Sequence, residues 1–406
     1  MHDGDIVGLI DIGSYNITIL VVRMFYANQK IELLAMEHKG VSALISQDGN
    51  IEEGALLEII YNIEEKQGLH VDNIAMSVGN NYLKFKNIQR GFKFEYPIAI
   101  NQSHITKIEK SCSDRKNMLN NDIIVDLFNN YYALDDKINV TDPINLQASS
   151  IVADYLLVYA NSSIINNLNR YVAKNKLEII SFVSSSQAAC LATIKPEHRI
   201  GSTAVISIGN CDTSVAIIEN GYLKNVNHLA IGGLKITNDI IKIFGLSRKD
   251  AENIKILASN IGTNDDCVLS KDNFSSLSSQ QIIRLSDVYQ VIHKNIKEIF
   301  IEISHLANAQ NIILTGGVSK MSNIEEIAQL ILKKHCQIGI AKNQDWIIHN
   351  NQNWQINILK STNYTTVIGI GGYLLKKYKQ KHLSEHNNFF LNKLYKISSF
   401  FEELFY

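Results

Sequence analysis

Residues 6–22 read IVGLIDIGSYNITILVV, and apolar residues dominate both ends of this stretch. β-Branched residues are frequent among them, which favours two strands. The break between them, Asp11-Ile12-Gly13-Ser14, is too short for a helix but suits a tight hairpin, in which Gly13 can take a positive φ. Successive backbone N–H groups in such a turn form a concavity that attracts anions. Asp11 would repel a bare phosphate, so its presence suggests a hydrated cation between the two.

Two interpretations of this hairpin stand beside each other: a phosphate-and-magnesium turn, or an ordinary N-terminal hairpin with a glycine in its turn. Residues 203–219, TAVISIGNCDTSVAIIE, repeat the order of strand, glycine turn and strand. Two facing hairpins could hold a polyphosphate between them. The second hairpin is chemically weaker, because Ser207 stands where the first has Asp11, and Asn210, Cys211 and Asp212 follow Gly209.

The overall composition describes a folded protein of ordinary charge. A chain of 406 residues allows two or more domains, and 46% hydrophobic with 19% charged residues is typical of globular proteins. The net charge of −1 gives no argument for nucleic acid, and no nucleic-acid partner is predicted. The five cysteines are far apart and form no CxxC pair, so free thiols in a reducing cytoplasm are expected. There is no basic leader with a cleavage site and no run of about 18 apolar residues, so neither secretion nor a membrane-spanning helix is expected.

Strands that alternate with helices along both halves indicate the α/β class. The residues from 82 to 158 differ in texture, being polar-alternating and aromatic, and we interpret them as an inserted small subdomain. Hydrophobic periodicity predicts strands at 30–37, 73–78, 177–183, 225–231 and 311–315. It predicts helices at 50–67 (capped by Asn50), 104–113, 162–175, 184–193, 235–244, 247–258 (capped by Ser247), 280–309, 323–332 and 365–378.

Two glycine pairs and one charged pair are further candidates for a binding site. Gly232-Gly233 lead into a helix and suit either a phosphate approach or a common strand-to-helix turn. Gly316-Gly317 end a buried strand, where an open α/β sheet usually binds its ligand. Glu252 and Lys255 lie three residues apart on one helical face, and a solvated surface ion pair is the alternative interpretation.

The C-terminal stretch is a separate element. Lys376, Lys377, Lys379 and Lys381 precede LSEHNN, and FFLNKLYKISSFFEELFY follows at 389–406. On a helical wheel the following apolar residues share one face: Phe390, Leu394, Ile397, Phe401, Leu404 and Phe405. An amphipathic helix with large aromatics on a basic linker predicts an interfacial anchor on anionic lipids. The alternative is a helix that docks on the body or on another subunit, for which a polar, lysine-rich tether is seldom needed.

These features together resemble the actin-like ATPase superfamily, and within it the FtsA family of bacterial cell-division proteins. The resemblance covers nearly the whole chain in order, and it rests on GLIDIGSYNITILVV, IGGLKITNDI, AENIK, IILTGGVSKMSNIEEIA and the terminal helix. It implies an α/β, actin-like two-lobe ATPase fold of duplicated ribonuclease-H-like domains with an inserted small subdomain. The implied parts are the first lobe core (1–81 plus 159–196), the inserted subdomain (82–158), the second lobe core (197–234 plus 310–375), the second lobe small subdomain (235–309), the basic linker (376–388) and the amphipathic membrane-targeting helix (389–406).

The resemblance also implies a site for ATP or ADP with Mg²⁺. The first phosphate turn would comprise Asp11, Gly13, Ser14 and Tyr15, with Asp11 acting through magnesium-bound water. The second phosphate turn would include Gly209 and Thr213, and Gly232 and Gly233 would approach the phosphates or the ribose. Glu252 and Lys255 would contact the ribose and adenine side, and Gly316, Gly317 and Val318 would line the adenosine pocket.

The chain departs from the family at the second phosphate turn, which is normally rich in glycine and threonine and opens with an aspartate. Here it reads SIGNCDTS from Ser207 to Ser214, so the acid that would help hold magnesium or order the attacking water is missing. Asn210 and Cys211 make a close approach of the backbone to the γ-phosphate harder, and Asp212 could supply an acid from a different position. We expect nucleotide binding to survive better than hydrolysis, because phosphoryl transfer depends on accurately placed groups.

The implied function is a membrane-tethered, ATP-binding scaffold that anchors the tubulin-like division protein FtsZ. It would act at the division site, on the cytoplasmic face of the inner membrane, polymerise with itself and recruit later division proteins. The C-terminal tail of FtsZ would dock near 235–295. Two other classes stay open: a type IV pilus assembly protein of the PilM kind, which would lack the amphipathic tail, and a true actin-fold kinase or ATPase, which would need a competent acid where Ser207 stands.

Overall fold

The computed structural model describes residues 3–40, 54–114, 121–136, 138–195, 198, 200–261, 267–269, 282–342 and 344–378. Several sequence expectations lie outside these residues. They concern Asn50 as a helix cap, most of the basic linker, and the whole terminal helix with Phe390, Leu394, Ile397, Phe401, Leu404 and Phe405.

The first hairpin forms as predicted and begins a six-stranded sheet, although Gly13 is not among the glycines with a positive φ. β1 (Ile6–Ile12) and β2 (Asn16–Phe25) pair antiparallel, with Ile12 opposite Ile17. β3 (Lys30–Gly40) continues the meander, whereas β4 (Asn73–Val78) runs parallel to β1 and β9 (Glu178–Ser184) runs parallel to β4. The short β17 (Ile347–Ile348) joins the edge at β3, which gives the order β17-β3-β2-β1-β4-β9.

A second sheet repeats this topology. β10 (Ser202–Ile208), β11 (Thr213–Glu219) and β12 (Tyr222–Leu229) form an antiparallel meander. β15 (Asn311–Thr315) is parallel to β10, and β16 (His335–Ile338) is parallel to β15, in the order β12-β11-β10-β15-β16. Each sheet therefore has three antiparallel strands followed by two parallel ones, which is the internal duplication that the two glycine turns predict.

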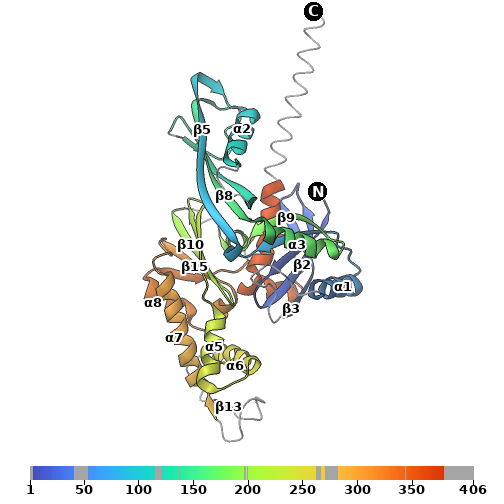
Figure 1. The fold of residues 1–406 in the computed structure, drawn as a ribbon, viewed down its shortest axis with the longest axis vertical. Coiled ribbons are helices and arrows are strands. Elements are labelled where there is room, and N and C mark those ends of the chain that lie inside the picture. The colour runs from blue at the N-terminus through green and yellow to red at the C-terminus, as the bar shows by residue number, and fades with distance from the viewer. Residues whose placement is uncertain are drawn as a thin grey trace, which may run out of the picture.

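A third sheet projects away from the two others (Figure 1). It is antiparallel in the order β5-β8-β6-β7, and α2 (Gln102–Cys112) packs against it. Its strands are β5 (Leu83–Ala99), β6 (Asp122–Leu134), β7 (Ile138–Val140) and β8 (Gln147–Asn161). The three buried residues of α2, Ile105, Ile108 and Cys112, recur at helical spacing and join one core with Ile151 and Tyr155 of β8.

Helices cover both faces of the first sheet, which explains why β1 and β2 are apolar on both sides. On one face, α1 (Ala55–Gln67, with Gly54 at its N-cap) and α3 (Ser162–Lys174) pack with Ile10 and Ile12. On the other, α4 (Ser185–Thr193) and a helix at 365–378 pack with Val7 and Leu9. Ala188 and Ala192 of α4 belong to this core.

One core in the second body unites α5 (Gly233–Phe244), α6 (Arg248–Ile261), α7 (Leu285–Ile303) and α8 (Ile324–Leu332). The Ser247 hydroxyl accepts a hydrogen bond from the Asp250 amide at 3.1 Å, which confirms the predicted cap of α6. The predicted helix at 280–309 is too long: Ile283 lies in the two-residue β14 (Ile283–Arg284), which pairs with β13 (Val268–Leu269), and the helix ends at Ile303. Apolar periodicity cannot separate a short buried strand from the first turn of the helix that follows.

Short elements complete the described chain, namely η1 (Asn80–Tyr82), η5 (Gly317–Lys320), α9 (Asn353–Leu359) and η6 (Thr362–Tyr364). The helices of the described ranges were searched for a membrane span, and none combines the necessary length and apolar character.

Candidate functional site

The two glycine turns have the same backbone geometry. Gly13 donates its amide to the Asn16 carbonyl at 2.9 Å, and Gly209 donates its amide to the Asp212 carbonyl at 2.8 Å. The flanking strands close in the same register, with Ile12 opposite Ile17 and Ile208 opposite Thr213. Ser207 is therefore the structural equivalent of Asp11, and Asp212 is the equivalent of Asn16.

Asp11 lies at the end of β1 with its carboxylate largely withdrawn from solvent. The Ser77 hydroxyl, on β4, donates a hydrogen bond to it at 2.5 Å. Burial raises the pKa of Asp11 to about 6, the Ser77 hydrogen bond opposes this rise, and the negative charge of Asp212 adds to it. Asp212 belongs to the second turn, so this charge acts between the two hairpins.

The tip of the first turn faces the second body as well. The Tyr15 side chain is 48% exposed, and its pKa is raised by burial and by the charge of Glu252 on α6. The backbone N–H groups of Ser14 and Tyr15 have no hydrogen-bond acceptor among the residues that the structure describes. They are available to an anion, which fits the expected phosphate turn.

The second turn is held from behind by the start of α5. Gly233 donates its amide to the Gly209 carbonyl at 2.9 Å, and Leu234 donates to the Asn210 carbonyl at 2.7 Å. A Cβ atom built on Gly232 would lie 2.6 Å from the Gly209 carbonyl oxygen, so no larger residue fits there. The N–H groups of Gly233 and Leu234, which could have cradled a phosphate, are committed to this contact.

Thr213 points into the protein interior. Its side chain is fully buried, and its hydroxyl donates a hydrogen bond to the Ile231 carbonyl at 2.7 Å. The sequence places Thr213 in the second phosphate turn, but the structure uses its hydroxyl to tie β11 to the segment that leads into α5.

Glu252 and Lys255 form a largely buried ion pair rather than a solvated one. The Lys255 ammonium lies 2.7 Å from the Glu252 carboxylate, and the Lys255 residue is only 8% exposed. The Thr237 hydroxyl lies 2.9 Å from the Lys255 Nζ and 2.6 Å from the Glu252 Oε2. Burial lowers the pKa of Lys255, and the adjacent Glu252 opposes that shift.

The turn after β15 closes this side of the site. Gly316 has a φ of +88°, and a Cβ atom built on it would lie 2.5 Å from the Ile208 carbonyl oxygen. A Cβ atom on Gly233 would lie 3.1 Å from Val318 and 3.5 Å from the Lys255 Nζ. The structure thus brings together the start of α5, the buried ion pair and the Gly316–Val318 turn, which are separate in the sequence.

Asn363 is a candidate that the sequence analysis missed. Its Oδ1 atom is buried without a hydrogen-bond partner among the described residues, and it lies 3.5 Å from a Cβ atom built on Gly317. Buried acceptors nearly always have a donor, so the atom suits a ligand that brings one, such as the amino group of adenine or a ribose hydroxyl. No motif or periodicity marks Asn363, because its role depends on contact with a turn 46 residues earlier.

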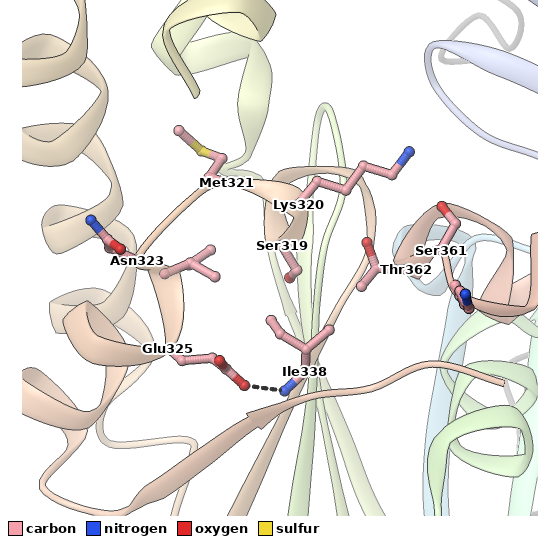
Figure 2. Close-up of a pocket in the computed structure, with 10 residues that line it drawn as sticks. Ser319, Lys320, Met321, Asn323, Glu325, Ile338, Ser361 and Thr362 are labelled. Carbon is pink, nitrogen blue, oxygen red and sulfur yellow. Dashed lines mark hydrogen bonds between the residues drawn. The ribbon is translucent and has the colours of Figure 1, made fainter. Parts of the chain in front are cut away.

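A cavity of about 390 Å³ opens behind the same turn (Figure 2). Ser319, Glu325, Ile338 and Thr362 lie around it. Three of its polar side chains are already engaged: Ser319 donates to the Thr315 carbonyl at 2.6 Å, Thr362 donates to the Gly316 carbonyl at 2.8 Å, and Glu325 accepts from the Ile338 amide at 2.7 Å. The cavity therefore lacks free donors from these groups for a phosphate.

Within the described ranges, no group of three or more histidine, cysteine, aspartate or glutamate residues is arranged to hold a metal ion. That Asp11 would reach a magnesium ion through water stays a prediction.

Comparison with known proteins gives the family. The model of the family described as cell division protein FtsA matches residues 204–369. The FtsA of Buchnera aphidicola subsp. Baizongia pistaciae is 26% identical over 376 residues, which is 86% of this chain and 85% of that protein. The FtsA of Buchnera aphidicola subsp. Schizaphis graminum is 22% identical and aligns over 98% of both chains. The chain is a divergent member of the FtsA family.

Solved structures confirm the predicted fold class for this FtsA-family chain. A PilM-PilN type IV pilus biogenesis complex has a chain that matches with a TM-score of 0.65 at 13% identity, covering 90% of this chain and 97% of that one. MreB 5 of Spiroplasma citri bound to AMPPNP matches with a TM-score of 0.51 at 12% identity, covering 95% of this chain and 100% of that one. These likenesses establish a mixed α/β, actin-like ATPase fold.

Proposed function

We propose that this FtsA-family cell-division protein is a membrane-tethered scaffold that binds ATP or ADP and hydrolyses ATP weakly or not at all. The observation that carries the proposal is the pair of equivalent glycine turns, of which the first has Asp11 and the second has Ser207 at the equivalent position. The proposed site retains both phosphate turns of an actin-like nucleotide site, but Ser207 stands where the second turn would carry an acid.

Several groups would hold the nucleotide. The free N–H groups of Ser14 and Tyr15 would receive a phosphate, and Asp11 would orient a magnesium-bound water. The orphaned Asn363 Oδ1 would accept from the nucleoside. A bound Mg²⁺ would neutralise phosphate charge beside the carboxylates of Asp11 and Asp212. The likeness to MreB 5, a protein whose solved structure contains AMPPNP, supports this assignment.

Weak turnover follows from the second hairpin. Ser207 cannot act as the acid that orders water, and the amides of Gly233 and Leu234 are committed to the Gly209 and Asn210 carbonyls. We expect binding of nucleotide by calorimetry together with an ATP turnover near the detection limit. Robust turnover that Asp11→Ala abolishes would contradict the scaffold function and favour an actin-fold ATPase or kinase.

Residues 389–406 would attach the protein peripherally to anionic lipids of the inner membrane. The chain that leads to them leaves the body from a firmly held helix, because the Tyr373 hydroxyl donates to Asp126 at 2.8 Å and Tyr378 stacks on Tyr26 at 4.0 Å. The test is co-sedimentation with anionic vesicles. Phe390→Ser with Phe401→Ser should abolish binding, whereas Asn392→Ala with Ser399→Ala on the opposite face should not. Binding that survives removal of residues 389–406 would contradict the tether.

The FtsZ tail would dock on the small subdomain of the second lobe, residues 235–309. Its expected region, 235–295, carries these exposed apolar residues: Ile243, Ile256, Leu257, Val268 and Ile282. Unpartnered apolar side chains of this number favour a peptide partner. Anisotropy with a labelled FtsZ tail peptide tests this: Ile256→Glu should weaken binding, and Ile301→Glu, which is also exposed but lies beyond the expected region, should not. The opposite ranking would contradict the location.

The division into lobes, inserted subdomain, linker and tail, and the ability to polymerise with itself, are parts of the same proposal. Their residue bounds stay a prediction. A PilM-like role has one observation in its favour, the TM-score of 0.65 to the PilM-PilN complex. Membrane recruitment that depends on another membrane protein, and that needs no residues beyond 388, would favour that role.

A further inference from the structure

We propose that Asp212 makes the proposed nucleotide site selective for a nucleoside diphosphate over a triphosphate, by placing a carboxylate where the terminal phosphate would lie. This inference rests on the proposed nucleotide site and assigns to Asp212 a role in specificity rather than in hydrolysis.

The first step is the orientation of the side chains that end the two turns. The Asn16 Oδ1 lies 3.2 Å from a Cβ atom built on Gly13, and the Asp212 Oδ1 lies 3.2 Å from a Cβ atom built on Gly209. Both side chains therefore fold back over their own turn in the same way. The first turn carries a neutral amide there, whereas the second carries a carboxylate.

The second step concerns the backbone N–H groups around that carboxylate, several of which already donate hydrogen bonds within the protein. The Asp212 backbone N–H is directed to its own side chain, and the Gly209 N–H is bonded to the Asp212 carbonyl. The start of α5 gives its N–H groups to the carbonyls of Gly209 and Asn210. The backbone N–H groups of Asn210 and Cys211 have no acceptor among the described residues, as is also true of Ser14 and Tyr15, so the second turn differs from the first by the negative charge of Asp212.

The third step is the path of the phosphates. The nucleoside end would be held by Asn363 and by the buried ion pair, so the terminal phosphate would extend farthest from them, between the two facing turns. There it would meet Asp11 and Asp212, whose charges already act on each other. His228, on β12, is the basic side chain whose charge acts on Asp212. A diphosphate stops short of this position and avoids most of the repulsion.

The test is calorimetric titration of the full-length protein with ADP and with AMPPNP, each in the presence of Mg²⁺. We expect the wild-type Kd for ADP to be lower by about tenfold, which corresponds to about 1.4 kcal/mol. Asp212→Asn reproduces the side chain of Asn16 without changing the shape of the turn. It should bring the two Kd values within about threefold of each other, mainly by tightening AMPPNP binding.

Asn16→Asp is the reciprocal variant, since it places the same charge over the first turn. It should weaken AMPPNP more than ADP. Equal wild-type affinities for the two nucleotides would overturn the inference while leaving the proposed function intact. A loss of affinity for both nucleotides in Asp212→Asn would also overturn it, because the carboxylate would then be holding the cation. Absence of binding by either nucleotide would overturn both this inference and the proposed nucleotide site.

Discussion

The hydroxyl of Ser186 donates a hydrogen bond to the hydroxyl of Ser214 at 2.9 Å, and both residues are 3% exposed. This bond joins α4, which follows the first sheet, to β11 of the second hairpin. The Asn80 amide donates to the same Ser186 oxygen at 2.7 Å, and its Oδ1 accepts from Ser184 at 3.0 Å. A fully buried polar chain therefore connects the end of β4 to the second glycine turn.

Removing the centre of this chain should destabilise the protein. Ser186→Ala leaves a buried amide of Asn80 and a buried hydroxyl of Ser214 without a partner, so we expect the free energy of unfolding to fall by about 1–3 kcal/mol. Urea denaturation of the protein measures it. Ser304→Ala, at an exposed hydroxyl, should change the free energy by less than about 0.5 kcal/mol. Equal effects of the two substitutions would contradict the structural importance of the chain.

The helix at 365–378 depends on a glycine for its close approach to α4. A Cβ atom built on Gly369 would lie 1.8 Å from the Ala188 carbonyl oxygen, a backbone atom that cannot move aside. Gly369→Ala should therefore lower the free energy of unfolding by about 3 kcal/mol or more, despite the better helix propensity of alanine. Gly40→Ala, where the added atom meets nothing within 4 Å, is the matched control. A Gly369→Ala protein as stable as that control would contradict the packing.

Breaking the buried ion pair should cost more than removing an exposed lysine. Lys255→Met keeps an apolar chain of similar length but leaves the Glu252 carboxylate without its ammonium partner, so we expect a loss of about 3 kcal/mol. The exposed Lys242→Met on α5 is the control. Adding Glu252→Gln to Lys255→Met should recover part of the loss, since no charge is then left unpaired. Failure of the second substitution to recover stability would argue against the pair as the cause.

Asp126 gives a prediction for the dependence of stability on pH. Burial raises the pKa of its carboxylate above the ordinary value of 3.8, while the Tyr373 hydrogen bond and the charges of Lys377 and Lys376 oppose the shift. The folded state therefore favours the protonated acid, and its stabilising contribution is lost as pH rises from about 4 through the raised pKa.

The comparison of wild type with Asp126→Asn isolates this contribution. Thermal unfolding between pH 4 and pH 7 should show a smaller decline in stability for the variant, because it has no proton to release at this position. Asp136→Asn, at an exposed position with a φ of +57° that asparagine tolerates, should follow the wild type. Parallel curves for wild type and Asp126→Asn would contradict the raised pKa.

Local patterns predicted most of the elements well. The bounds of β4 and β15 agree with the expected strands at 73–78 and 311–315, because apolar runs bounded by turn residues are recognisable without tertiary context. The error at 280–309 arose where Ile283 continues the apolar pattern of a helix but pairs with Leu269 in a strand. The pairing partner is distant in sequence and leaves no local signal.

Only the local features of the candidate site could be predicted, for the same reason. Asp11, Gly13 and the equivalent turn at Gly209 can be recognised from the residue types in a short stretch of sequence around each turn. The direction of the Thr213 hydroxyl, the contact of Gly232 with Gly209, and the orphaned Asn363 acceptor depend on how separate segments pack. A motif shows which residue types are present, but not which way a buried hydroxyl points.

The sequence by itself determined that this chain has two glycine hairpins, that the second lacks an acid at Ser207, and that an amphipathic segment ends the chain. These features are local, since turn chemistry and hydrophobic periodicity act over a few residues. Only the tertiary structure decided that the charge of Asp212 acts on Asp11, that the first amides of α5 donate to the second turn, and that Lys255 is buried with Glu252. Those relationships join residues that are far apart in sequence, and burial, charge and hydrogen bonding between them exist only once the sheets and helices have packed.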